Sequence, residues 1–153
     1  MAITQTAKQF IEQVMTTDPI SVEGGMTASE LAVILDENEI SGAPVVDALD
    51  HVIGVVSRTD LLHRCVEGPL GSRPGTFLSS IAEGTGGTLD PDSLGTVSEF
   101  MNPEPVTAQP GESITSVARR MHEERVHRVI VVDANGHLLG VVTSLDMLAV
   151  VAS

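Results

Sequence analysis

The chain has 153 residues, with 21 Asp or Glu against 8 Lys or Arg, a formal net charge of −13 and a hydrophobic fraction of 42%. This composition supports a folded core of one domain's size and excludes a disordered chain. Its acidity argues against nucleic acid or an anionic membrane as the main partner, because both require clustered cations.

The first residues do not have the pattern of a secretory signal, because Lys8 comes late and no apolar core follows Met1. No apolar run approaches the roughly 18 residues that a membrane-spanning helix needs. The single cysteine, Cys65, has no partner for an internal disulfide. We therefore expect a cytoplasmic protein without a membrane partner.

An internal repeat organises the chain. Met15 and Met101, Pro19 and Pro105, and other identical residues are separated by 86 positions. Residues 14–62 align with residues 100–148 without a gap and match at 15 of 49 positions. A unit of about fifty residues rarely buries enough surface to be stable alone, so the two copies are expected to pack pseudo-symmetrically as one module.

The elements of copy one can be read in chain order. A short strand is expected at residues 20–22. Thr27 and Glu30 have the spacing of a capping box and open a helix, whose apolar face is predicted to contain Ala28, Leu31, Ala32 and Leu35. Two strands follow at 45–46 and 52–56 around a turn.

Copy two repeats this order, and its turn at residues 133–136 has the more typical hairpin sequence, because it ends in Asn135-Gly136. The last helices are expected to begin near Thr59 and Leu145. Each copy is thus β-α-β-β-α, which predicts an α+β fold, an α/β sandwich with helices covering a small sheet.

The repeat predicts that the chain divides into three segments. Residues 1–65 form the first domain with an N-terminal segment, residues 66–98 a linker or mobile loop, and residues 99–153 the second domain. The middle segment is rich in Gly, Ser, Pro and Thr, which is typical of a linker. A lid or dimer contact made by Phe77, Leu78 and Ile81 is the alternative.

The charge is divided unevenly. Residues 1–99 hold 15 of the 21 acids, whereas the second copy holds 6 acids and a cluster of four arginines with two histidines among them. On an acidic protein this cluster is the place that could receive an anion. Its members are Arg119, Arg120, His122, Arg125, His127 and Arg128.

Two matched segments, 54–60 and 140–146, each run from an apolar strand into a helix start. They bring together a hydroxyl and a carboxylate, Ser57 with Asp60 and Thr143 with Asp146. Such a corner suits a ligand whose phosphate accepts hydrogen bonds from the hydroxyl and the helix amides and whose cis-diol donates hydrogen bonds to the carboxylate. It equally suits simple helix capping, and the spacing alone leaves both interpretations open.

The ordered motifs resemble a known family. Val14-Met15, Pro19-Ile20-Ser21-Val22, Ala43 to Asp47 and Gly54 to Asp60, repeated from Phe100-Met101 to Asp146 with His127-Arg128 before a strand, are similar to a tandem cystathionine-beta-synthase (CBS) domain pair, or Bateman module. The resemblance covers both copies and leaves out only the first dozen residues and the linker.

The resemblance implies a ligand site for an adenine nucleotide. By the family pattern, Asp60 holds ribose hydroxyls, Ser57 and Thr59 approach the ribose or phosphate, and His127 and Arg128 contact the phosphate. Val55, Pro105 and Val106 would enclose the adenine. AMP is the expected ligand, with ADP, ATP, NAD or S-adenosylmethionine as further candidates.

The pseudo-symmetric second site departs from this pattern. It keeps Thr143 and Asp146, and Ile20 and Val141 would lie near the adenine base. However, Leu145 stands at the position of Thr59, and Ser41-Gly42 stand at the positions of His127-Arg128. A site without a guanidinium has no bidentate partner for a phosphate. We therefore expect it to be weaker, empty or occupied by a less charged adenosyl ligand.

The function expected from the resemblance is a stand-alone regulatory module, a homodimer that senses an adenine nucleotide by conformational change. The alternative is a dimerising structural or interaction module without a physiological nucleotide. No catalytic residues and no cofactor requirement are expected, so we do not expect an enzyme. No metal site is expected either, since His122 and His127 are five residues apart and cannot share a helix face.

Overall fold

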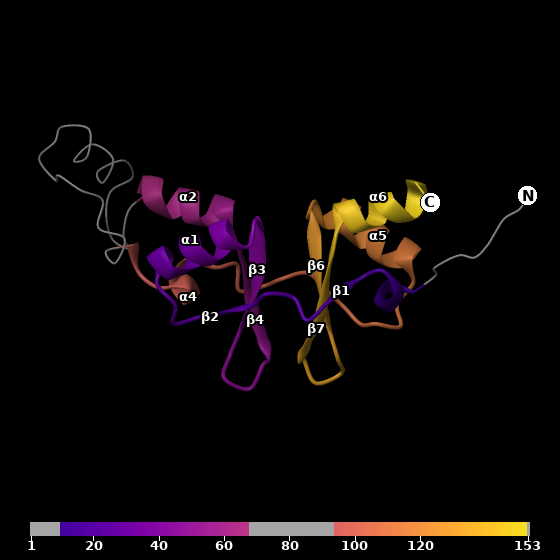
Figure 1. Ribbon diagram of the computed structural model, residues 1–153. Coiled ribbons are helices and arrows are strands. Elements are labelled where there is room, and N and C mark those ends of the chain that lie inside the picture. Colours follow the sequence, from indigo (N-terminus) through magenta and orange to yellow (C-terminus); the bar gives the residue numbers. More distant parts are fainter. Residues whose placement is uncertain (1–9, 68–93, 153) are drawn as a thin grey trace, which may run out of the picture. The chain divides into compact units, whose positions relative to one another are not determined.

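The structure is a computed structural model that describes residues 10–67 and 94–152 (Figure 1). It confirms the mixed α+β fold and the repeated β-α-β-β-α order. Most of the segment predicted as a linker or mobile loop, with Phe77, Leu78 and Ile81, lies outside the described residues. Within the described residues, no helix is both long enough and apolar enough to cross a membrane.

Each copy contains two helices and a small set of strands. Copy one consists of β2 (Val22–Glu23), α1 (Ala28–Glu37), β3 (Gly42–Val46), β4 (Val52–Ser57) and α2 (Arg58–Glu67). Copy two consists of β5 (Thr107–Ala108), α5 (Ile114–Glu124), β6 (Arg128–Val132), β7 (Leu138–Thr143) and α6 (Ser144–Ala152). Short segments precede the copies: η1 (Ile11–Gln13) and β1 (Thr16–Thr17) before copy one, and α4 (Val97–Phe100) before copy two.

The chain divides into two compact units that do not follow the order of the copies. Unit 1 contains the described residues 10–20, 48–52 and 104–152, and unit 2 contains 21–47, 53–67 and 94–103. Unit 1 has a sheet with the strand order β1-β7-β6-β5, and unit 2 contains most of a sheet with the order β2-β3-β4. In unit 1 the β5–β6 pairing is parallel and the β6–β7 pairing antiparallel, and in unit 2 the β2–β3 pairing is parallel.

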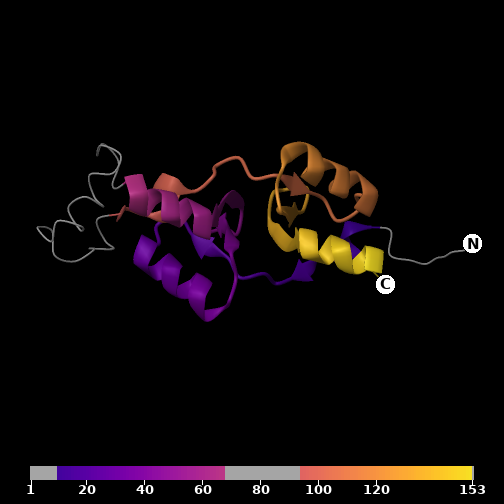
Figure 2. The same cartoon turned by 90° about the horizontal axis from the view of Figure 1, so that it is seen from above.

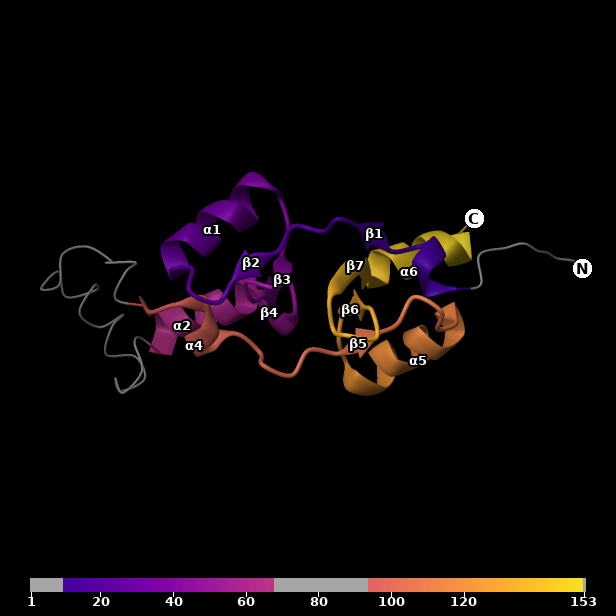
Figure 3. The ribbon, with the colours of Figure 1, turned by 90° about the horizontal axis from the view of Figure 1, so that it is seen from below.

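This division arises because each leading segment joins the last strand of the other copy. β1 pairs with β7, with Thr16 opposite Val141. At the matched position of copy two, Asn102 exchanges two backbone hydrogen bonds with Val55, of 3.0 and 2.8 Å. In Figure 3, α4 lies beside α2 in unit 2.

Close approach of the leading segments explains two repeated glycines. A Cβ on Gly54 would lie 2.6 Å from Met101 Sδ and 2.8 Å from Asn102 O. A Cβ on Gly140 would lie 2.7 Å from Thr16 O and 2.8 Å from Met15 Sδ. Glycine is therefore required at both strand positions, because real Cβ atoms do not approach other atoms so closely.

Each unit has its own hydrophobic core. The helices of each copy lie side by side (Figure 2). Ile11 and Val97, which are 86 positions apart and open the two leading segments, are both fully buried. The core of unit 1 contains Ile11, Ala108, Val117, Met121, Val129, Val131 and Val142, and that of unit 2 contains Val22, Leu31, Leu35, Ala43, Val45, Val56 and Val97.

Helix α1 begins as predicted. Glu30 N donates to Thr27 Oγ1 at 3.1 Å and Thr27 N donates to Glu30 Oε1 at 3.2 Å, which completes the capping box. Ala28, Leu31 and Leu35 are buried. The prediction that Ala32 also faces the core is wrong, because it lies about 100° around the helix from Leu31.

The other element boundaries shift slightly. The strand predicted at 20–22 begins only at Val22, and Ile20 is exposed. The last helices begin at Arg58 and Ser144, one residue before the expected starts.

In unit 1 the turn at residues 48–52 pairs with the β6–β7 turn. Val52 N donates to Gly136 O at 3.0 Å, and Leu138 N donates to Asp50 O at 3.1 Å. The rings of His51 and His137 stack, with centroids 4.3 Å apart. These two turn histidines are therefore packed and partly buried.

Candidate functional site

The two strand-to-helix corners have nearly the same geometry. At the β4–α2 corner, Asp60 Oδ2 accepts hydrogen bonds from Ser57 N at 2.8 Å and Ser57 Oγ at 3.0 Å, and Asp60 N donates to Ser57 Oγ at 3.2 Å. At the β7–α6 corner the corresponding distances between Thr143 and Asp146 are 2.8, 3.1 and 3.3 Å. Both pairs thus cap their helices reciprocally.

Capping uses only one oxygen of each carboxylate. Among the described residues, neither Oδ1 of Asp60 nor Oδ1 of Asp146 accepts a hydrogen bond. Both aspartates are partly buried at the start of a helix, where the N-terminal end of the dipole favours an anion. Each corner therefore fixes a carboxylate that keeps hydrogen-bonding capacity for a hydroxyl group.

A backbone hydrogen bond joins the first residue of each corner helix to the residue directly before the neighbouring strand. Ser144 N donates to His127 O at 2.9 Å in unit 1, and Ser144 Oγ is 3.3 Å from the same oxygen. Arg58 N donates to Ser41 O at 2.8 Å at the matched place in unit 2. This arrangement places His127 beside the start of α6.

The residues predicted for the first site are divided between the two units. Val55, Ser57, Thr59 and Asp60 belong to unit 2, whereas Pro105, Val106, His127 and Arg128 belong to unit 1. Thr59 is exposed in the first turn of α2, and Val106 O accepts a hydrogen bond of 3.0 Å from Ile130 N. The joint site remains a prediction.

The residues predicted for the second site all belong to unit 1: Ile20, Val141, Thr143 and Asp146. Arg128 also lies close to them, because it is the register partner of Thr143 across the β6–β7 ladder. The structure thus places a guanidinium-bearing residue next to the corner that the sequence assigned to the weaker site.

One arginine of the basic cluster has a structural role. Arg120 forms an ion pair with Glu112 and donates from Nη1 to Thr107 O at 2.8 Å. The hydrogen bonds from Arg120 hold the pKa of Glu112 below its usual value, and Glu112 raises the pKa of the guanidinium. Arg120 therefore anchors α5 to the segment around β5, and only the remaining bases are candidates for binding an anion.

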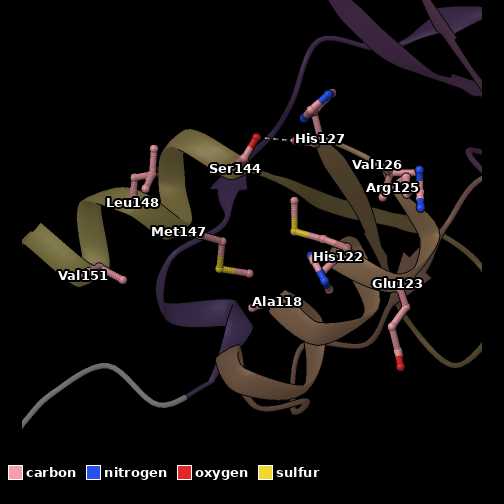
Figure 4. Close-up of a pocket in the computed structure, with 11 residues that line it drawn as sticks. Ala118, His122, Glu123, Arg125, Val126, His127, Ser144, Met147, Leu148 and Val151 are labelled. Atoms are coloured by element: carbon pink, nitrogen blue, oxygen red, sulfur yellow. Dashed lines mark hydrogen bonds between the residues drawn. The ribbon is translucent and has the colours of Figure 1, made fainter.

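A groove between α5 and α6 was missed by the sequence reasoning. It has a volume of about 900 Å³ and lies entirely within unit 1 (Figure 4). Ala118, Met121, Met147, Leu148 and Val151 supply its apolar wall, and His122, Arg125 and His127 lie along its edge. The feature of the sequence that indicates this groove is α6 itself, because its residues are apolar on nearly every side.

In the described part of the chain, no three His, Cys, Asp or Glu side chains are grouped so that they could hold a metal ion. Burial raises the pKa of the Cys65 thiol, which disfavours the reactive thiolate.

Comparison with protein families gives a match to the CBS domain at residues 11–67 and again at residues 97–153. Among curated proteins, the chain is 30% identical over 135 residues to the gamma-3 subunit of human 5'-AMP-activated protein kinase, covering 88% of the chain and 23% of that subunit. Other curated relatives are also much longer, and the chain spans 22% of one of them.

Solved structures of CBS-pair proteins share this fold. CBSX2, a CBS-pair protein of Arabidopsis thaliana, superposes in its complex with AMP with a TM-score of 0.73 at 22% identity, covering 95% of this chain and 97% of that one. The CBS domain pair of protein MJ0100, in complex with 5'-methylthioadenosine and S-adenosyl-L-methionine, gives a TM-score of 0.70 at 22% identity, covering 94% and 95%.

Proposed function

The chain belongs to the CBS domain family, and from this premise we propose that it is a regulatory module that binds an adenine nucleotide, with AMP as the first candidate, and has no catalytic activity of its own. The proposed strong site combines the Asp60 corner with His127 and Arg128. A cytoplasmic location and self-association as a homodimer are parts of the same proposal.

The observation that carries this proposal is the fixed carboxylate of Asp60. Its Oδ2 atom is held by Ser57, so its Oδ1 atom can accept a hydrogen bond from a ribose hydroxyl without loss of the cap. Arg128 would supply the charge that a phosphate requires. AMP in the CBSX2 complex and the adenosyl ligands of MJ0100 support an adenosine-containing ligand.

We propose that the second corner binds more weakly. Thr143 and Asp146 reproduce the cap, but Leu145 replaces the Thr59 hydroxyl, and Ser41-Gly42 stand at the positions that match His127-Arg128. A ligand at this corner would thus have no guanidinium at the position that matches Arg128 in the strong site, and Arg128 itself, the register partner of Thr143, is proposed to serve the strong site. A thioether ligand with less charge than AMP fits this site better than a nucleotide.

A bound nucleotide would act by ordering residues that come from both units. Contacts of one ligand with Asp60 of unit 2 and Arg128 of unit 1 would stabilise the conformation in which both residues reach that ligand. A partner or a second copy that contacts only that conformation would then respond to the nucleotide concentration. This is the proposed signal.

Thermal unfolding with AMP, ADP, ATP, NAD and S-adenosylmethionine tests the proposal. A ligand that binds only the native state at about 100 times its Kd stabilises it by about 2.7 kcal/mol, which corresponds to roughly 5–10 °C in Tm for a chain of this size. At least one adenosyl ligand should produce such a shift, and guanosine monophosphate should not. If no ligand shifts Tm, the interaction module without a nucleotide becomes the better account.

A further inference from the structure

Two histidines at matched positions of the repeat meet in unit 1. His51 and His137 form an isolated antiparallel bridge, with ring centroids 4.3 Å apart and an angle of 19° between the ring planes. The backbone hydrogen bonds between the two turns join the residues before and after each histidine rather than the histidines themselves. This pattern makes them a non-hydrogen-bonded pair, in which opposite side chains come closest.

The same backbone conformation presents both rings. Asp50 and Gly136 directly precede the histidines, and both have a positive φ, of 66° and 86°. Each histidine is followed directly by a strand, β4 after His51 and β7 after His137. These are the strands that end at the two carboxylate corners. The stack therefore joins the starts of the two strands whose far ends lead to the candidate site.

The two turns, and the leading segments that pair with β4 and β7, carry acids and neither Lys nor Arg. His137 Nδ1 lies 3.3 Å from Asp133 Oδ2. Backbone hydrogen bonds from His137 and Asn135 hold the pKa of Asp133 below its usual value, so this carboxylate stays ionised in the range where histidines titrate. The acids of these segments are Asp18, Asp47, Asp50, Glu104 and Asp133.

This environment accommodates one imidazolium but not two. A proton on His137 strengthens its contact with Asp133, and a cationic ring can stack on a neutral aromatic ring. A second proton, on His51, places two like charges on rings whose centroids are 4.3 Å apart, and these charges repel each other. Both rings are partly buried, so water screens this repulsion incompletely. The stacked pair therefore takes up fewer protons in acid than the same two histidines in the unfolded chain.

We infer that the His51–His137 stack is a pH-sensitive clasp, which holds the turn at residues 48–52 on the β6–β7 turn while at least one ring is neutral and releases it when both are protonated. Histidines of the unfolded chain take up protons as the pH falls through about 6.5. Because the folded pair takes up fewer, the stability that the stack contributes is present above this pH and is lost below it.

The clasp also connects pH to the candidate ligand site. Release of the turn frees the start of β4, whose other end positions Ser57 and Asp60. A ligand that binds the clasped form should therefore bind more weakly in acid, since the two equilibria are linked. This step rests on the proposed nucleotide binding, whereas the clasp itself does not.

A double-mutant cycle measures the coupling between the two rings. Urea unfolding followed by circular dichroism compares the original chain, His51→Gln, His137→Gln and the double variant at about pH 8 and about pH 5.5. The lower pH lies below the ordinary histidine pKa of about 6.5 and above the sequence pI of about 4.5. Titration of other groups cancels in the cycle. The coupling should favour folding by roughly two- to tenfold in the unfolding equilibrium constant at the higher pH and vanish or reverse at the lower.

A variant that keeps an aromatic ring separates charge from packing. His51→Phe cannot take up a proton, and the protonated His137 can stack on the neutral ring. This variant should remain within about threefold of the original unfolding equilibrium constant at the higher pH, and it should lose less stability in acid. His63→Gln, at an exposed position of α2, controls for the loss of one histidine and should keep the acid sensitivity of the original chain.

Calorimetric titration of AMP into the original chain and His51→Phe at both pH values tests the link to the ligand. The AMP phosphate and His127 titrate with both chains, so only the difference between the chains reports the clasp. From the higher to the lower pH, the affinity of the original chain should fall about threefold more than that of His51→Phe.

Each outcome bears on a separate step. A coupling that is favourable at the higher pH and lost at the lower, with acid resistance in His51→Phe, supports the clasp. A coupling of equal size at both pH values, or none at either, overturns it. An AMP affinity that falls equally in the two chains overturns the link to the ligand. If the original chain binds no AMP at either pH, the proposed function fails, and the urea cycle still decides on the clasp.

Discussion

Replacing Gly54 by alanine should destabilise unit 2 by separating a leading segment from β4. The added Cβ would lie 2.6 Å from Met101 Sδ and 2.8 Å from Asn102 O. The sulfur is the end of a flexible side chain and can move aside, but the carbonyl belongs to a backbone that is hydrogen-bonded to Val55 at 3.0 Å. Overpacking of this kind costs about 1–3 kcal/mol.

Urea unfolding followed by circular dichroism measures this cost. Gly111→Ala is the matched control, because apart from the adjacent residues of the chain no atom lies within 4 Å of the added Cβ at that position, and it should be neutral or slightly stabilising. Gly140→Ala should behave like Gly54→Ala, since its Cβ would meet Thr16 O at 2.7 Å. If Gly54→Ala unfolds within about 0.5 kcal/mol of the control, the close approach of the leading segment to β4 is refuted.

Three further changes test local features. Asp50→Gly should stabilise by roughly 0.5–1 kcal/mol in thermal unfolding, because Asp50 has φ of 66° where copy two uses Gly136; no gain would contradict the left-handed turn. Thr27→Ala should cost about 1 kcal/mol in urea unfolding through loss of the α1 cap, and an unchanged midpoint would reject that cap. Glu112→Gln should lower stability at neutral pH. Because the folded-state pKa of Glu112 is depressed, the difference from the original chain should shrink as pH falls through that pKa; a gap independent of pH would exclude the ion pair with Arg120.

The repeat made the order of the elements predictable. Hydrophobic residues recur at matched places, and the Thr27 capping box and the Gly136 turn have local chemistry that identifies them without tertiary information. Ala32 was misplaced because a small apolar residue at the margin of a helix face carries little information about burial. The position after Pro19 predicts a strand from Ile20, but the strand begins at Val22.

The exchange of leading segments was not predictable from one copy alone. Met15 and Gly140 are both repeated residues, but nothing local shows that the methionine of one copy packs against the glycine of the other. The stacking of His51 on His137 depends on the same tertiary pairing. The sequence shows that these residues are repeated, but it does not show which residue of the other copy each of them contacts.

The candidate site was predictable in part. The spacing of Ser57 and Asp60 anticipated that hydroxyl and carboxylate come together, and their hydrogen bonds show the capping function directly. Spacing could not show which carboxylate oxygen remains available. The groove at α6 was not predictable from motifs, because exposed apolar residues without a polar pattern form it.

Calorimetric titration of AMP into the original chain, Asp60→Ala and Asp146→Ala tests the central claim most directly. The two substitutions remove caps of nearly equal geometry, so each should cost about the same stability, roughly 1 kcal/mol. The account predicts saturable AMP binding in the original chain and in Asp146→Ala, and its loss in Asp60→Ala. Equal AMP affinity in all three chains, or no binding of any adenosyl ligand to the original chain, would contradict it.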